Sequence, residues 1–295
     1  MAPPAPKVTE ALHPTAEDLD LVPVEEVVER LHREDRLALD AVSAARGSIV
    51  AAARAASDAL LRGGRVLYVG AGTSGRLGVL DASELPPTFG LHPSRVQAVI
   101  AGGWRALRQP VEGAEDDAEA GARAVSLFGA TPQDWVCGIS ASASTPFVLG
   151  ALEEARRAGA QTALLCCAPV PAHRKPAALI IQLDTGPELL AGSTRLKAGT
   201  ATKLALNAIS TAAMVRMGKV YRGRMVDLQP TNIKLKARAL RIVVELTGLK
   251  PAVAEALLLD AGGQPRVALA MHWAQVDRKK AQKLLSTHSL RELER

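Results

Sequence analysis

The stretch RVLYVGAGTSGRLGVLDASELPPT, residues 65–88, combines an apolar run, a glycine-rich turn and a helical pattern. Residues 65–70 are β-branched or apolar and are bounded by glycines, which is typical of a strand buried on both faces. Gly70, Gly72 and Gly75 follow, and we expect a helix after Gly75. A buried strand that turns directly into a helix is the repeating unit of an α/β protein.

The sequence on either side continues this alternation. Apolar residues recur at helical spacing from Val24 to Leu61, and Gly63 and Gly64 end that pattern. Further strands are predicted at 96–103, 134–140, 162–169 and 178–184, and helices at Glu115–Leu127, from Pro146, and at Ser193–Met217. These elements predict a doubly wound, mostly parallel sheet flanked by helices, with its binding crevice at the carboxyl ends of the strands.

The two ends of the chain differ from this middle part. Residues 1–22 are rich in proline and acidic groups and predict an extended arm before a main domain at 23–235. Strand signals stop after Leu235, and three short amphipathic helices separated by Gly- and Asp-containing turns follow. We therefore expect residues 236–295 to form a small helical appendage of the ubiquitin-associated type.

Composition excludes several classes of function. The net charge of +6 is accompanied by only 3% aromatic residues, which argues against stacking on nucleic-acid bases. The six histidines show no metal-ligand spacing, so no metal site is predicted. The three cysteines lie in apolar runs without a disulfide spacing, and neither a secretory signal nor a membrane-spanning run is present. We expect a soluble, cytoplasmic protein that binds neither nucleic acid nor a membrane.

The glycine-rich turn fits an anion, although two familiar nucleotide sites do not fit. Its GxGxxG pattern is that of a dinucleotide site, but the second strand ends in Val99–Gly103, without the carboxylate that binds ribose. A Walker loop would need a Gly-Lys-Ser/Thr that is missing. The segment Gly72–Arg76 offers backbone amides, two hydroxyls and a helix start, which suit a single phosphate. A tight turn without a ligand is the alternative.

Two more hydroxyl clusters lie at predicted strand-to-helix junctions. Ser140–Pro146 follows the third strand, and Gly192–Lys197 begins the long later helix with two cations. Either cluster alone is also typical of helix capping. Three clusters at one edge of a sheet favour a site for a sugar phosphate.

Two glutamates are candidates for proton transfer. Glu84 lies in a proline-flanked, weakly polar segment, where a carboxyl group tends to keep its proton, as a general acid must. Glu115 lies at the predicted start of a helix, whose dipole favours the ionised form of a base. Loop hydrogen bonding is the alternative role for Glu84, and helix capping for Glu115. Glu112 and Asp116 are rivals to Glu115.

Four strings carry a more specific resemblance. They are VGAGTSGRLGVLDASELPPTFG, AGGWRALRQPVEGAEDD, GSTRLKAGTATKLALNAIST and GKVYRGRMVDLQPTNIKLKARA. Together they resemble the N-acetylmuramic acid 6-phosphate etherase family, and the likeness extends over nearly the whole chain. That family belongs to the sugar isomerase (SIS) superfamily, so the resemblance implies an SIS-type α/β sandwich and a homodimer.

The resemblance also implies an activity and a set of residues. The implied reaction is the cleavage of the D-lactyl ether of N-acetylmuramic acid 6-phosphate, a step of amino-sugar metabolism and peptidoglycan recycling, without a cofactor or metal. The family's two key glutamates fall on Glu84, which would protonate the departing oxygen, and on Glu115, which would remove the C2 proton. The implied substrate-binding residues are Gly72, Thr73, Ser74, Gly75, Arg76, Ser83, Ser142, Ser144, Thr145, Ser193, Thr194 and Lys197.

This chain departs from the family pattern at two places. The family has Ser-Gly-Arg-Thr-Pro where this chain has Ser142–Pro146, with Ala143 and Ser144 in place of glycine and arginine. His13 stands where asparagine is expected. Two other functions on the same fold remain open. One is a non-catalytic regulator resembling glucokinase regulatory protein, and the other is an aldose–ketose isomerase, which the DASE and GAED strings disfavour.

Overall fold

The structure is a computed structural model that describes residues 8–171, 173, 175–230 and 232–294. Residues 1–7 of the predicted arm and residue 295 of the predicted appendage lie outside the described residues. The chain forms two compact units. One contains residues 1–83 and 94–213, and the other contains residues 84–93 and 214–295.

The first unit is built on a five-stranded sheet of order β2-β1-β3-β4-β5, and all four strand pairs are parallel. The strands are β1 (Val66–Gly70), β2 (Val96–Ile100), β3 (Trp135–Ile139), β4 (Gln161–Cys166) and β5 (Leu179–Gln182). The chain moves outward from β1 to β2 and then returns to place β3 on the other side of β1. Ligands of open α/β sheets bind beyond the strand ends at such a reversal. The predicted doubly wound parallel sheet is confirmed.

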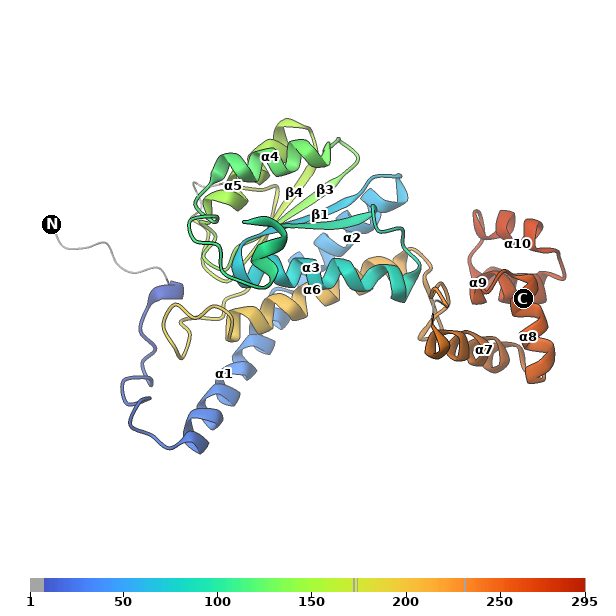
Figure 1. Ribbon diagram of the computed structural model, residues 1–295, viewed down its shortest axis with the longest axis horizontal. Coiled ribbons are helices and arrows are strands. Elements are labelled where there is room, and N and C mark those ends of the chain that lie inside the picture. Colours follow the sequence, from blue (N-terminus) through green and yellow to red (C-terminus); the bar gives the residue numbers. More distant parts are fainter. Residues whose placement is uncertain (1–7, 172, 174, 231, 295) are drawn as a thin grey trace. The chain divides into compact units, whose positions relative to one another are not determined.

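Helices cover both faces of this sheet, with α4 and α5 on one face and α3 and α6 on the other (Figure 1). The elements outside the sheet are a 3₁₀ turn at Val8–Glu10, α1 (Val24–Ala44), α2 (Arg46–Leu61), α3 (Gly72–Phe89), a 3₁₀ turn at Gly103–Leu107, α4 (Ala118–Phe128), α5 (Pro146–Arg157) and α6 (Lys197–Arg216). The region predicted to be helical from Val24 to Leu61 forms two helices that are separated at Ala45. The ψ angle of Ala45, 7°, lies outside the α-helical region.

Side chains alternate between the two faces of the central strand. Leu67 and Val69 of β1 are fully buried against the inner faces of α4 and α5, which include Val125 and Phe147. Tyr68 points to the other face, where its ring makes an edge contact with Trp135. Burial on both faces explains why β1 is a continuous apolar run without a polar alternation.

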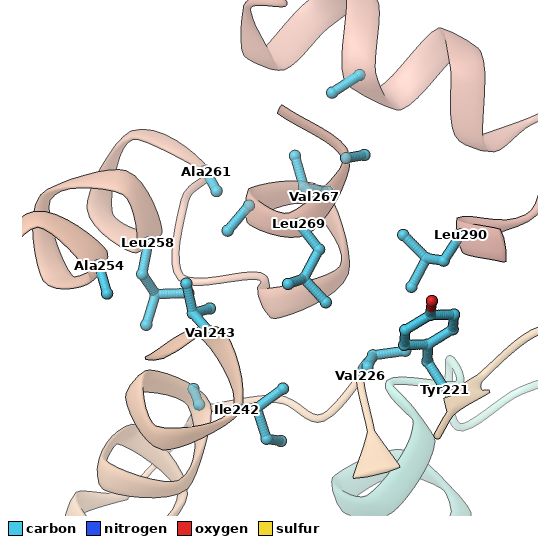
Figure 2. Packing of buried hydrophobic residues seen from close by; sticks show 14 of the residues in the cluster. Tyr221, Val226, Ile242, Val243, Ala254, Leu258, Ala261, Val267, Leu269 and Leu290 are labelled. Carbon is cyan, nitrogen blue, oxygen red and sulfur yellow. The ribbon is translucent and has the colours of Figure 1, made fainter. Parts of the chain in front are cut away.

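The second unit has a core of its own. Its elements are the short antiparallel strands β6 (Val220–Tyr221) and β7 (Arg224–Met225), followed by α7 (Ile233–Thr247), α8 (Pro251–Asp260), α9 (Pro265–Ala274), α10 (Arg278–Leu285) and α11 (Leu290–Leu293). Apolar side chains from these elements, including Ile242, Leu258 and Leu269, pack together (Figure 2).

Sequence and structure agree only in part on this second unit. The three short helices predicted after Leu235 correspond to α8, α9 and α10, whereas α7, α11 and the hairpin were not predicted. The boundary at residue 235 and the ubiquitin-associated type remain predictions, because compact packing does not identify a domain family. Within the described residues, no helix combines the length and apolar character needed to cross a membrane.

Candidate active site

The turn between β1 and α3 is held tight by two of its glycines. A Cβ atom on Gly70 would lie 2.6 Å from the backbone nitrogen of Gly75, and one on Gly75 would lie 2.6 Å from Cγ1 of Ile100. Gly72 is different, because a Cβ there would meet nothing within 4 Å, but its φ of +51° favours glycine. The outer glycines therefore allow close packing, and the middle one allows the chain to turn.

Helix α3 starts at Gly72 rather than after Gly75, so the predicted phosphate loop forms the first turn of the helix. The first bond of that turn runs from the Gly75 N–H to the Ala71 carbonyl, with an N···O distance of 3.1 Å. The amides of Gly72, Thr73 and Ser74 precede it and have no acceptor within the helix. Such amides, together with the positive end of the helix dipole, form an anion-binding site.

A cavity of about 200 Å³ lies beside this helix start. Arg76 of α3 reaches it, and its Nε donates a hydrogen bond of 3.4 Å to the Leu107 carbonyl. Glu115 lines the same cavity, and so does its rival Glu112. The full lining is Ala71, Gly72, Arg76, Ala101, Ala106, Pro110, Val111, Glu112, Gly113, Ala114 and Glu115. The structure thus brings part of the phosphate loop and the candidate base together.

Glu115 is not the residue that caps the following helix. Helix α4 begins at Ala118 instead of the predicted Glu115, and its N-cap is Asp117, whose carboxylate accepts a 2.7 Å hydrogen bond from Ala120 N–H. The Glu115 carbonyl accepts a 3.0 Å hydrogen bond from the Phe147 amide at the start of α5. Because Asp117 caps the helix, the exposed Glu115 carboxylate is left available for chemistry.

The second hydroxyl cluster is organised by its own hydrogen bonds. The hydroxyls of Ser140 and Thr145 lie 2.7 Å apart, and those of Ser142 and Ser144 lie 2.9 Å apart. Between them Ala143 has a φ of +56°, the left-handed conformation that favours glycine. The loop therefore keeps a glycine-like backbone at the position where this chain has alanine.

The third cluster lies close to the first. Ser193 and Thr194 lie in the turn that precedes α6, because α6 begins at Lys197 and not at the predicted Ser193. A Cβ on Gly199 in the first turn of α6 would lie 3.6 Å from Cγ2 of Thr73 in the phosphate loop. Lys197 is buried, and its ammonium group forms an ion pair with Glu34 of α1.

Glu84 and Ser83 lie on α3, so the loop hydrogen bonding considered as an alternative role for Glu84 has no loop to act in. The helix continues through Pro86 and Pro87, and the Glu84 side chain is exposed. The Ser83 hydroxyl donates a 2.9 Å hydrogen bond to the Leu80 carbonyl within the helix. Glu84 belongs to the second unit and Glu115 to the first.

Asp81 is a polar residue that the sequence analysis did not single out. Its carboxylate is buried and accepts hydrogen bonds from Tyr68 Oη at 3.2 Å, Asn207 Nδ2 at 3.0 Å and Ser210 Oγ at 3.0 Å. Burial raises the pKa of Asp81, although the hydrogen bonds from Asn207, Ser210 and Tyr68 oppose that shift. The available signal was its place in the DASE string, one helical turn before Glu84.

Curated proteins that resemble this chain over most of its length include several N-acetylmuramic acid 6-phosphate etherases. This chain is 50% identical over 281 residues to the N-acetylmuramic acid 6-phosphate etherase of Trichormus variabilis, covering 95% of this chain and 92% of that protein. The etherase of Picosynechococcus sp. is 49% identical over 283 residues, with 95% and 93% covered. The profile of the glucokinase regulatory protein N-terminal SIS domain matches residues 48–156.

Solved structures with related backbones are more distant. A protein of E. coli CFT073 in complex with A5P gives a TM-score of 0.49 at 16% identity, covering 68% of this chain and 96% of that chain. A phosphoheptose isomerase from Francisella tularensis gives 0.47 at 18% identity, covering 64% and 95%.

Proposed function

This chain belongs to the N-acetylmuramic acid 6-phosphate etherase family, and from that premise we propose that it cleaves the D-lactyl ether of N-acetylmuramic acid 6-phosphate. The products are N-acetylglucosamine 6-phosphate and D-lactate, and the enzyme is a carbon–oxygen lyase. The observation that supports this reaction best is the cavity in which an anion-binding helix start, Arg76 and Glu115 meet. A phosphate-binding site and a proton acceptor are the two features that this substrate requires of the enzyme.

The substrate's phosphate binds at the start of α3 in this proposal. The free amides at Gly72–Ser74 and the guanidinium of Arg76 supply donors, and Ser193 and Thr194 lie in the turn before α6, whose first turn contacts Thr73. Ser142, Ser144 and Thr145 lie after β3, on the other side of the strand-order reversal. Small hydroxyl side chains donate to phosphate without blocking it. The ammonium group of Lys197 is paired with the carboxylate of Glu34, so Lys197 contributes less directly to phosphate binding.

The chemistry is an elimination followed by a hydration. Opening of the sugar ring to the aldehyde makes the C2 proton acidic, and Glu115 removes it. The electron pair then forms a C2–C3 double bond as the C3–O bond breaks, and Glu84 gives its proton to the departing lactyl oxygen. Water adds to C3, its proton passes to Glu84, and C2 regains a proton. Each general acid or base step accounts for a factor of about 10² to 10⁴ in rate.

The direct test is release of D-lactate from N-acetylmuramic acid 6-phosphate by the purified protein with no added metal. A coupled D-lactate dehydrogenase assay measures the rate, and mass spectrometry identifies the sugar product. The non-catalytic regulator predicts that the sugar phosphate binds tightly while no D-lactate forms. That result would overturn the proposed reaction.

An apolar stripe on α1 supports the homodimer that the family resemblance implies. Val24, Val28 and Leu39 lie on one side of the helix and are exposed to solvent. Apolar residues that are exposed along one face of a helix suit a partner surface. We assign that partner to a second copy of this chain. Light scattering should give twice the monomer mass of 30.9 kDa, and Val28→Asp should shift the protein toward monomer.

Two further assignments follow from the same premise. Cys137, Cys166 and Cys167 are free and buried, and burial raises the pKa of each thiol to about 12. Free, unreactive thiols suit the reducing cytoplasm, where we place the enzyme in peptidoglycan recycling. Fractionation of the native cells tests the compartment.

We also propose that residues 23–235 form the SIS domain and that residues 236–295 form the helical appendage.

A further inference from the structure

Lys197, the first residue of α6, is only 2% exposed although its side chain is charged. Its ammonium group is paired with the carboxylate of Glu34 on α1. A second buried carboxylate, that of Glu188, accepts hydrogen bonds from the amides of Lys197 at 3.0 Å and Ala198 at 2.8 Å. Buried charges are retained only where they are paired and hydrogen-bonded. The start of α6 is thus fixed by two carboxylates, one from the preceding turn and one from α1.

The N-terminal arm reaches the same carboxylate through His13. Nε2 of His13 lies 3.2 Å from Oε2 of Glu34. Nδ1 of the same ring accepts a 3.3 Å hydrogen bond from the Thr15 amide, which can only donate, so Nδ1 carries no proton. With Nδ1 acting as an acceptor, Nε2 is the ring nitrogen that carries a proton, and it is the atom that faces Glu34. Oε2 of Glu34 therefore faces both Nε2 of His13 and the ammonium group of Lys197.

The arm also contacts the turn that leads into α6. The Thr9 carbonyl accepts a 3.0 Å hydrogen bond from the Gly192 amide. A Cβ on Gly192 would lie 2.9 Å from Oε2 of Glu10, so the arm packs directly over this turn. After the turn, Gly199 in the first turn of α6 lies next to Thr73 of the phosphate loop. The chain 192–199 is held between the arm and the proposed phosphate site.

We propose that His13, Glu34 and Lys197 are positioning residues that hold the turn 192–196 against the phosphate loop, so that the N-terminal arm contributes to phosphate binding without touching the substrate. The inference rests on the proposed function, because it takes the helix starts of α3 and α6 as the phosphate site. Its chemical basis is one chain of polar contacts, from the imidazole through Oε2 of Glu34 to the ammonium group of Lys197.

His13→Ala tests this path because it removes the arm's contact to Glu34, together with the local contact of the ring to Thr15. We expect KM for N-acetylmuramic acid 6-phosphate to rise about tenfold, the usual effect of losing a hydrogen bond to a charged group, with kcat changed less than about twofold. His13→Asn keeps a donor amide and should restore most of the affinity. Glu34→Gln, which leaves the buried Lys197 without its charge partner, should raise KM further.

The matched control is Arg33→Ala on α1. Arg33 pairs with Glu26 and Glu29 on the exposed side of the helix, so its loss should leave KM unchanged. Calorimetric titration with N-acetylglucosamine 6-phosphate and with unphosphorylated N-acetylglucosamine separates the phosphate contribution. In His13→Ala only the phosphorylated sugar should bind more weakly.

The proposal is overturned if His13→Ala leaves KM unchanged, or if it weakens both sugars equally. A fall in thermal stability with an unchanged KM would show a purely structural role and would also overturn it. Failure of the proposed function is recognised separately, because the wild type would then release no D-lactate while the titration of N-acetylglucosamine 6-phosphate still measures the effect of His13.

Discussion

Arg76 and Glu115 line the same cavity, although β2 and a 3₁₀ turn separate them in the chain. Arg76 is placed by the first turn of α3. Glu115 lies in a turn that is fixed by the hydrogen bond from the Phe147 amide, at the start of α5, to the Glu115 carbonyl. A guanidinium and a carboxylate in one cavity suit a substrate that presents a phosphate and an acidic C–H bond. The cavity thus divides binding and proton removal between two elements of the sheet's carboxyl edge.

Glu115→Gln should lower kcat for D-lactate release by about 10² to 10⁴, because an amide cannot accept the C2 proton. The fold should persist, since Asp117 rather than Glu115 caps α4. Glu112→Gln is the matched control, because Glu112 lines the same cavity. Should Glu112→Gln prove the more damaging change, Glu112 would be the base.

Glu84→Gln should reduce D-lactate release to a similar extent but should leave proton removal intact. If Glu84 acts only on the departing oxygen, the variant still exchanges the C2 hydrogen of N-acetylglucosamine 6-phosphate with deuterium oxide. Proton NMR follows that exchange, and Glu115→Gln should abolish it. Loss of exchange in Glu84→Gln, with the sugar phosphate still bound, would contradict the division of roles.

Arg76→Ala should raise KM about ten- to a hundredfold, because a guanidinium forms directed, charge-assisted hydrogen bonds to phosphate. Arg76→Lys should recover part of the affinity but not all of it, since a lysine ammonium lacks the fork of donors. Steady-state kinetics with inhibition by inorganic phosphate measures both effects. An unchanged inhibition constant for phosphate in Arg76→Ala would remove Arg76 from the phosphate site.

Local sequence patterns predicted the part of the site that depends on local geometry. Gly70 and Gly75 leave no room for a Cβ, so a glycine pattern at that spacing indicates the tight turn. The carboxyl edge of a parallel sheet then brings separate turns together, as the predicted topology required. Helix starts were less predictable, because the cap of α4 is Asp117 and three acidic residues in a row compete for that role.

Long-range pairing could not be predicted from spacing. The bond between Lys197 and Glu34 joins residues 163 positions apart, and neither has a local signature that distinguishes it from a solvated charge. Sequence patterns also do not predict the extension of α3 through Pro86 and Pro87, since each proline lacks the amide that an interior helix bond requires. The helix nevertheless closes, with the Gly90 amide bonded to the Pro86 carbonyl.

Asp134→Asn should destabilise the first unit by about 3 kcal/mol at neutral pH, because Asp134 is a buried carboxylate paired with Arg65. Burial alone would raise its pKa, but hydrogen bonds from Arg65 and Thr131 outweigh burial and hold the pKa of Asp134 below its usual value. Since the folded pKa is lowered, this stabilisation is present above the unfolded value near 4 and is lost as pH falls through the folded value.

Urea unfolding at pH 7 and at acidic pH measures the free energy of unfolding of wild type and Asp134→Asn. The difference in this free energy between the two proteins should become smaller below about pH 4. The exposed pair of Asp18 and Arg30 is the control, and Asp18→Asn should have a much smaller effect at either pH. A gap that stays constant with pH would show that Asp134 acts through its shape and not its charge.

Ala143→Gly should cost less stability than an equivalent change elsewhere in the core. Ala143 is 8% exposed with a φ of +56°, and Ala160 is 7% exposed in the same core cluster without a positive φ. Both substitutions remove one methyl and add chain entropy to the unfolded state, but only the first relieves a left-handed alanine, which costs about 1 kcal/mol. Urea unfolding should therefore find Ala160→Gly the more destabilising of the two by about 1 kcal/mol. Equal losses of stability would show that the backbone at position 143 leaves the left-handed conformation in solution. The loop would then not keep the glycine-like backbone that brings the hydroxyls of Ser142 and Ser144 together.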